Sequence, residues 1–93
     1  MNAPTKFNYV RSKKLMKLYR TISCQHCGAN DGTVCGAHSN QSKHGKGRGI
    51  KASDIYCASL CWNCHMMIDQ GELSRELAIE IWDYAHNRTF EIL

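Results

Sequence analysis

The sequence contains no long hydrophobic run, and proline occurs only once among its 93 residues. Without such a run, no segment can cross a bilayer as a helix, so no membrane contact is expected. The first ten residues also lack the apolar stretch of a secretory signal, which favours the reducing cytoplasm as the location. A chain this short makes a single domain, residues 1–93, and its small apolar core calls for disulfides or a metal in support.

Acidic residues are almost absent from the first part of the chain. Residues 1–53 hold ten Lys and Arg against one acid, Asp31, which gives a formal charge of +9. Residues 54–93 hold seven Asp and Glu against two Arg, which gives −5. A basic half of this density predicts a polyanionic partner, most simply nucleic acid. The alternative is a solvated basic surface that serves solubility.

The pattern of hydrophobic residues predicts a small α+β fold made of short elements. The expected elements are an amphipathic basic helix over 6–22, two antiparallel strands over 33–38 and 54–60, and helices over 61–69 and 74–86. Helical periodicity and strand-forming residues support these assignments. Gly71 is the expected stop of the first of the two later helices, and Ser74 is the expected N-cap of the second.

The segment between the two expected strands is rich in glycine and in basic residues. Gly45, Gly47 and Gly49 alternate with basic side chains, so the backbone is free to follow a chain of phosphates. The residues predicted to contact nucleic-acid phosphates are Lys43, His44, Lys46, Arg48 and Lys51. Few apolar side chains hold this loop, and we therefore expect it to be mobile in the free protein.

The six cysteines include two Cys-x-x-Cys pairs, Cys24 with Cys27 and Cys61 with Cys64. Two such pairs can meet in space and form a closed tetrahedral zinc site with four thiolate ligands, which is structural because no position remains for water. The alternatives are disulfides, which need an oxidising compartment, and an iron–sulfur cluster, which usually has tighter cysteine spacing. The two other cysteines are expected to be buried free thiols, Cys35 and Cys57.

Three further residues have the chemistry that phosphodiester hydrolysis needs. His65 and Asp69 lie four positions apart, on one face of the helix that follows the second cysteine pair, and can share a divalent cation. His38 ends the first strand beside the basic loop, where a neutral imidazole can take a proton from water. In the alternative interpretation, His65 donates a hydrogen bond to a sulfur or a carbonyl, and Asp69 is a polar residue near a helix end.

The order of these residues resembles that of a known family, the HNH or ββα-metal endonucleases, above all the small zinc-containing forms found in bacteriophages and prophages. The resemblance covers residues 24–71. It rests on Cys24-Gln25-His26-Cys27, Ala37-His38, Asp54, Leu60-Cys61-Trp62-Asn63-Cys64-His65 and Asp69.

The resemblance implies a role for each matching residue. His38 becomes the general base, His65 a ligand of the catalytic cation, and Asp69 a second ligand where many relatives have His. Asp54 is the nearest match to the central Asn and is expected to hold the loop or to orient His38. Ala37 stands where many relatives have a metal ligand. The cation would therefore rest on two side chains, water and the phosphate, which favours Mg²⁺ or Mn²⁺.

The fold that the resemblance implies is a zinc-stabilised ββα-metal domain with flanking N- and C-terminal helices. The function it implies is a metal-dependent DNA endonuclease, with phage or prophage DNA processing or recombination as the setting. A zinc-containing module that binds nucleic acid without cutting it is the alternative from another class. A zinc domain that binds proteins is a third interpretation, and the oligomeric state is not indicated.

Overall fold

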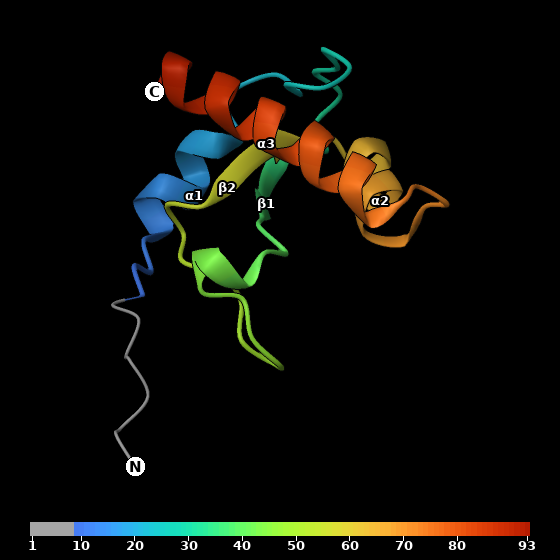
Figure 1. Ribbon diagram of the computed structural model, residues 1–93. Helices are drawn as coiled ribbons and strands as arrows, with labels where there is room; N and C mark the ends of the chain where they lie inside the picture. Colours follow the sequence, from blue (N-terminus) through green and yellow to red (C-terminus); the bar gives the residue numbers. More distant parts are fainter. Residues whose placement is uncertain (1–8) are drawn as a thin grey trace.

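The computed structural model describes residues 9–93 and is a mixed α/β structure with a two-stranded antiparallel sheet (Figure 1). Its elements are α1 (Lys13–Tyr19), β1 (Cys35–His38), the 3₁₀ turn η1 (Ser42–His44), β2 (Cys57–Leu60), α2 (Trp62–Gln70) and α3 (Arg75–Ile92). The predicted α+β class, the antiparallel hairpin and both later helices are confirmed.

The sheet lies between α1 and α3. Gly36 of β1 lies against Tyr19 of α1, so closely that a Cβ at position 36 would stand 2.5 Å from Tyr19 Cδ2. The next strand residue, Ala37, packs in one buried cluster with Trp82 and Ala85 of α3. Because successive residues of a strand point to opposite faces, α1 and α3 cover opposite faces of the sheet.

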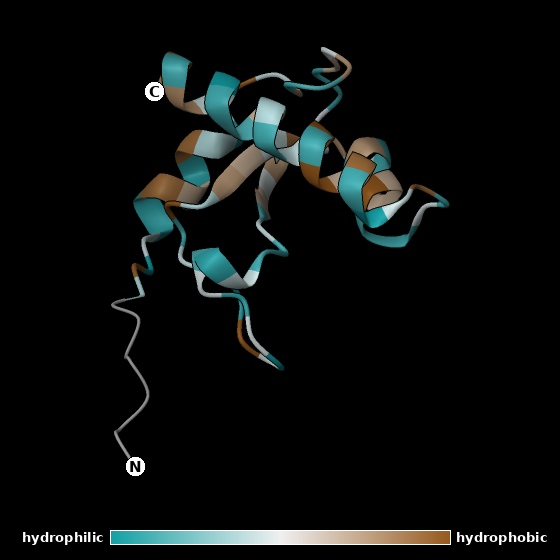
Figure 2. Cartoon of the chain, in the orientation of Figure 1, coloured by the Kyte–Doolittle hydropathy of each residue, from teal (hydrophilic) through white to brown (hydrophobic). Residues whose placement is uncertain are grey.

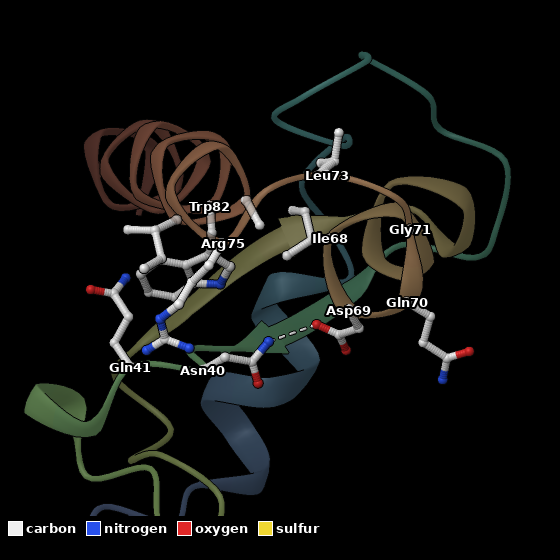
Figure 3. A pocket seen from close by; sticks show the side chains of 11 residues that line it. Asn40, Gln41, Ile68, Asp69, Gln70, Gly71, Leu73, Arg75 and Trp82 are labelled. Atoms are coloured by element: carbon white, nitrogen blue, oxygen red, sulfur yellow. Dashed lines mark hydrogen bonds between the residues drawn. The ribbon is translucent and has the colours of Figure 1, made fainter.

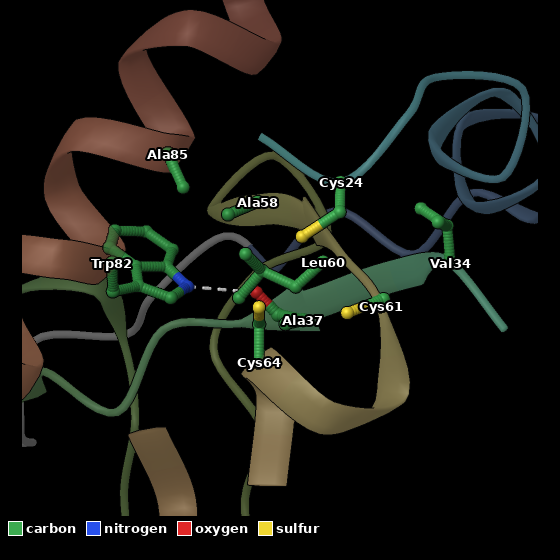
Figure 4. Packing of buried hydrophobic residues seen from close by; sticks show 9 residues of the cluster. All are labelled: Cys24, Val34, Ala37, Ala58, Leu60, Cys61, Cys64, Trp82 and Ala85. Carbon is green, nitrogen blue, oxygen red and sulfur yellow. Dashed lines mark hydrogen bonds between the residues drawn. The ribbon is translucent and has the colours of Figure 1, made fainter. Parts of the chain in front are cut away.

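The core is built around β2 and the start of α2 (Figure 4). Its members are Cys24, Val34, Ala37, Ala58, Leu60, Cys61, Cys64, Trp82 and Ala85. The indole N–H of Trp82 donates to the carbonyl of Ala37 at 2.9 Å, so the largest side chain of this cluster also has its polar atom satisfied. Figure 2 shows that β2 is mostly hydrophobic and that the outer side of α3 is hydrophilic.

The first helix is much shorter than predicted. It begins at Lys13, because the Ser12 hydroxyl accepts a hydrogen bond from the backbone N–H of Leu15 and caps the helix. Residues 9–11 are not helical, since their polar groups bind the loop and turn that precede β2. The helix ends at Tyr19, and positions 6–8 of the prediction lie outside the described residues.

The strands are also shorter than predicted, because residues near their ends have other partners. The backbone N–H of Asp54 donates to the carbonyl of Val10, and that of Tyr56 donates to Ser53, so the chain turns before β2 begins. The hydroxyl of Thr33 donates to Asp31 and accepts from Trp62 N–H, so β1 begins two residues later than expected. These side-chain contacts compete with the strand ladder.

Helix α3 continues past its predicted end at His86 to Ile92. Thr89 explains the extension: it is fully buried, its hydroxyl donates to Ala85 O, and it accepts the backbone N–H of Ser59 in β2. The N-cap of α3 is Ser74 and the C-cap of α2 is Gly71, as predicted. Within residues 9–93, no helix combines the length and the apolar character that a membrane crossing requires.

Candidate metal centre and polar site

The four paired cysteines come together from two places in the fold. Cys24 and Cys27 lie in the turn after α1, where Gly28 adopts a φ of +83° that favours glycine. Cys61 is the N-cap of α2, and Cys64 lies in its first turn. Pairing of β1 with β2 fixes the position of Leu60, and the second cysteine pair begins at the next residue. The sheet therefore sets where the second pair lies.

The sulfur atoms of Cys24, Cys27, Cys61 and Cys64 lie within 4.8 Å of one another. Those of Cys27 and Cys61 are 3.6 Å apart. In a tetrahedral site with zinc–sulfur bonds of about 2.3 Å, neighbouring sulfurs stand about 3.8 Å apart. Three of the four residues are buried. The cluster is therefore compatible with a structural zinc ion.

The titration of these thiols also fits a cation. Burial opposes the ionisation of Cys24, but hydrogen bonds that its sulfur accepts from the backbone of Cys27, Cys61 and His26 outweigh this effect and lower its pKa to about 6. Burial and the neighbouring thiols raise the pKa of Cys64. The two pKa values thus shift in opposite directions. All four thiols of so close a group can be ionised together only when a positive ion compensates their charge.

His38 and Asp54 form a second, separate polar site. His38 Nε2 lies 2.8 Å from Asp54 Oδ1, and the two side chains are only 16% and 7% exposed. The other ring nitrogen of His38, Nδ1, makes no hydrogen bond within residues 9–93. The contact that was expected between Asp54 and the His38 ring is thus present, although His38 closes β1 while Asp54 lies three residues before β2.

Asp54 is ionised at neutral pH. Burial opposes its ionisation, but hydrogen bonds from His38 and from the Ser12 backbone N–H, together with the charge of Arg11, hold its pKa below the ordinary value. An ionised carboxylate only accepts hydrogen bonds, so it requires the ring proton of neutral His38 on Nε2. Nδ1 then carries a free lone pair.

His65 and Asp69 form a third polar pair, on α2. His65 Nε2 lies 3.0 Å from Asp69 Oδ2, while Asn40 Nδ2 donates to Asp69 Oδ1 at 2.8 Å. Two adjacent ligands of an octahedral Mg²⁺, each about 2.1 Å from the ion, also stand about 3.0 Å apart. His65 Nδ1 lies 3.9 Å from the sulfur of Cys35, so the alternative interpretation, a hydrogen bond from His65 to sulfur, has a geometric basis too.

The structure does not gather His38, His65 and Asp69 into one group. Across residues 9–93, only the four cysteines converge as a set of three or more potential ligands. His38 is paired with Asp54, and His65 is paired with Asp69. The side chains expected to hold a catalytic cation thus supply two ligand atoms in one place, and the remaining ligands would have to come from water or substrate.

A groove of about 530 Å³ opens between the end of α2 and the start of α3, beside this third pair (Figure 3). Asn40 and Asp69 line it together with Ile68 and Trp82. Arg75 also lines it, and its guanidinium makes no hydrogen bond or ion pair with any of residues 9–93. Neither Arg75 nor Asn40 could be singled out from the sequence, since an isolated Arg in an acidic half and an Asn in a loop are ordinary.

Four of the five predicted phosphate contacts are exposed: Lys43, Lys46, Arg48 and Lys51. The fifth, His44, is turned inward. Its ring stacks on Tyr56 with centroids 4.4 Å apart, and its Nδ1 lies 2.6 Å from Ser39 Oγ. Burial, reinforced by the charges of Lys43 and His86, lowers the pKa of His44, and an uncharged ring is a weak partner for phosphate. Its position therefore fits a structural role better.

The basic loop is better anchored than expected. Gly47 and Ile50 exchange two backbone hydrogen bonds of 3.1 Å near its tip. At its base, Ala52 and Ser53 are buried and bind the segment that precedes α1. The expectation of a mobile loop considered apolar contacts only, whereas polar contacts hold the base of this loop; its mobility stays a prediction.

The two remaining cysteines differ from each other. Cys57 is fully buried, as predicted, and burial, followed by the charge of Asp54, raises its pKa to about 12. Cys35, in contrast, is only partly buried. Its sulfur faces His65 of α2 at 3.9 Å. Burial also raises the pKa of Cys35. Both are free thiols in the structure.

Comparison of the chain with protein-family models, with curated proteins and with solved structures gives no match.

Proposed function

We propose that this protein is a metal-dependent DNA endonuclease of the HNH type, with a structural zinc ion on Cys24, Cys27, Cys61 and Cys64. The observation that carries the proposal is the 2.8 Å contact between His38 and Asp54, with Nδ1 of His38 left free. A histidine oriented by a carboxylate is a typical arrangement of a general base. The HNH resemblance of residues 24–71 supplies the reaction class.

His38 and Asp54 act together in the proposed reaction. Asp54 keeps the ring proton on Nε2, so Nδ1 accepts a proton from water as the water oxygen attacks phosphorus. The bond from phosphorus to the 3′ oxygen breaks, the departing 3′ oxygen takes a proton from solvent, and a 3′-hydroxyl and a 5′-phosphate end remain. His65 and Asp69 would hold a Mg²⁺ or Mn²⁺ ion, which supplies neutralising charge at the scissile phosphate and the leaving oxygen.

The substrate is bound through its phosphates. Lys43, Lys46, Arg48 and Lys51 are exposed on one loop that is anchored at its base, so their charges can follow a DNA backbone without sequence preference. The setting we propose is phage or prophage DNA processing or recombination in the cytoplasm.

A second function is a zinc-containing module that binds nucleic acid without cutting it. Ala37 favours this candidate, because alanine cannot coordinate a metal where many HNH nucleases have a ligand. The presence of only two converging ligand atoms at His65 and Asp69 in the described part of the chain favours it as well.

Nicking of supercoiled plasmid by the purified zinc-loaded protein separates the two candidates. We expect nicking with Mg²⁺ or Mn²⁺, none after EDTA, and none from His65→Ala at any concentration of either ion. Zinc content is measured in parallel, because EDTA also strips a structural zinc. If no DNA form is cut with any divalent ion while binding persists, the binding module takes the place of the nuclease.

A further inference from the structure

Residues 9–12, which we call the N-terminal strap, lie across the base of the basic loop and the turn that follows it. The Tyr9 hydroxyl donates to Gly45 O at 2.8 Å, and Val10 N–H donates to Ser53 Oγ at 2.7 Å. The carbonyl of Val10 accepts from the backbone N–H of Asp54 at 2.8 Å. These partners are more than thirty positions away in sequence, so the strap joins segments that are distant along the chain.

Arg11 makes the central contacts of the strap. Its Nη1 donates to Ala52 O at 2.6 Å, and its Nη2 donates to Lys51 O at 2.9 Å. The same Nη1 lies 3.4 Å from Asp54 Oδ1, the oxygen that also faces His38. The planar guanidinium thus spans the end of the basic loop and the carboxylate, with a geometry that the point charge of a lysine cannot reproduce.

Asp54 has its other oxygen fixed by the strap as well. Oδ2 accepts the backbone N–H of Ser12 at 2.7 Å, while Oδ1 faces His38 and Arg11. Both carboxylate oxygens therefore have fixed directions, and the His38 ring is held by one of them. Without the strap, the carboxylate would be free to rotate away from the ring.

We propose that Arg11 is a positioning residue: it holds the Lys51–Asp54 turn against the strap and thereby sets the orientation of the His38 ring. Lys51, one of the proposed phosphate contacts, belongs to the same turn, since its carbonyl accepts a hydrogen bond from Arg11. The inference rests on the proposed function, because it makes Arg11 a determinant of the cleavage rate at His38 and not a phosphate contact.

Three single variants of the full-length protein test the proposal. Arg11→Gln removes the charge and most of the planar guanidinium fork, whereas Arg11→Lys keeps the charge and loses the fork. Lys14→Gln removes the same charge from an exposed residue of α1 whose side chain makes no hydrogen bond or ion pair in the described chain. Each is checked for zinc content and for its unfolding transition before use.

Cleavage kinetics give the first readout. A displacement of about 1 Å at a catalytic group costs about 10²-fold in rate. We expect kcat to fall by about that factor in both Arg11 variants with KM changed less than about twofold, and Lys14→Gln to keep the wild-type kcat. Equal losses in Arg11→Gln and Lys14→Gln, with Arg11→Lys fully active, would show that only charge matters and would overturn the proposal.

NMR of the His38 ring gives a readout that does not need cleavage. Two-bond ¹⁵N–¹H correlations at neutral pH report which ring nitrogen carries the proton. We expect Nε2–H in the wild type and in Lys14→Gln, and a mixture of tautomers in the Arg11 variants. If the wild type cuts no DNA but the tautomers shift as expected, the nuclease proposal fails and the positioning role stands. An unchanged His38 ring in folded Arg11→Gln overturns the positioning role itself.

Discussion

The two ends of the β-hairpin are held in different ways. Next to Cys35 and Leu60, four sulfur atoms from two chain segments converge within 4.8 Å. Next to His38 and Cys57, a strap, a loop and a turn are joined by separate hydrogen bonds of 2.6–3.4 Å. The first end is held at the single cluster of four sulfurs, whereas the second end is held by many separate hydrogen bonds, each of them weak.

This difference teaches where the molecule tolerates change. Loss of one ligand from a four-thiolate site removes most of the metal's contribution, because binding and folding of such a site are one event. Loss of one hydrogen bond costs about 1 kcal/mol on average, and neighbouring contacts remain. We therefore expect all-or-none effects at the cysteine end and graded effects at the polar end.

The largest effect is expected from Cys64→Ser. Structural zinc contributes on the order of 10 kcal/mol, which is comparable with the whole stability of a typical domain, so this variant should be unfolded at 25 °C. Circular dichroism and zinc content measure the result. Cys35→Ser is the control, since it makes the same atomic change outside the cluster and should cost far less. A metal-free Cys64→Ser protein with a native-like unfolding transition would contradict the comparison.

The next effect concerns His38 at the polar end. Removal of a general base costs about 10² to 10⁴ in rate, so His38→Ala should lose most plasmid nicking while zinc content and DNA affinity stay close to wild type. His26→Ala, which alters an exposed histidine of the cysteine end, should cut normally. Cleavage by His38→Ala at the wild-type rate would remove this residue from the mechanism.

A smaller effect is expected at the tip of the basic loop. The double variant Lys46→Gln and Arg48→Gln should weaken DNA binding similarly for all sequences and reduce the slope of log K against log salt by about 0.9 per lost contact. Fluorescence anisotropy at four or more salt concentrations measures the slope, with Arg88→Gln as a control in the acidic half. An unchanged slope would show that the tip of the loop does not contact the phosphates of the bound DNA.

The smallest effect is the acid sensitivity that Asp54 confers. Its pKa is lower in the folded protein than the ordinary value of about 3.9. The folded state therefore gains stability from Asp54 above that value and loses it as the pH falls through the lowered pKa. In urea unfolding, the difference between wild type and Asp54→Asn should shrink below about pH 4. Zinc loss in acid affects both proteins, so only their difference is interpreted, and a constant difference would exclude this linkage.

Local patterns in the sequence were enough for the two cysteine pairs, for the end of α2 and for the start of α3. Two Cys-x-x-Cys pairs predicted that four sulfurs could meet at one point, and the structure has these sulfurs within 4.8 Å of one another. Ser74 and Gly71 act on their own helices through nearby backbone groups, and the structure has both caps where the sequence indicated them. Such features depend on neighbours within a few positions.

The polar end could be predicted only in part. The HNH resemblance suggested Asp54 as a residue that holds the loop or orients His38, and the two side chains are in contact, but the contacts of Arg11 join residues forty positions apart and leave no local trace in the sequence. The same holds for Asn40 with Asp69 and for Thr89 with Ser59. Helix α1 was predicted too long for this reason: its first residues were read by periodicity, while distant partners determine their conformation.

The division of the cysteine pairs between two distant segments has a consequence for biosynthesis. Residues 28–60, which include both strands and the basic loop, lie between the pairs. At about 5–20 residues per second, a ribosome needs about 2–7 s to make this stretch. During that time Cys24 and Cys27 have left the peptidyl-transferase centre and the other two ligands do not yet exist. A four-thiolate metal site can therefore form only once Cys64 has been made, and until then the nascent chain holds just the first of the two cysteine pairs.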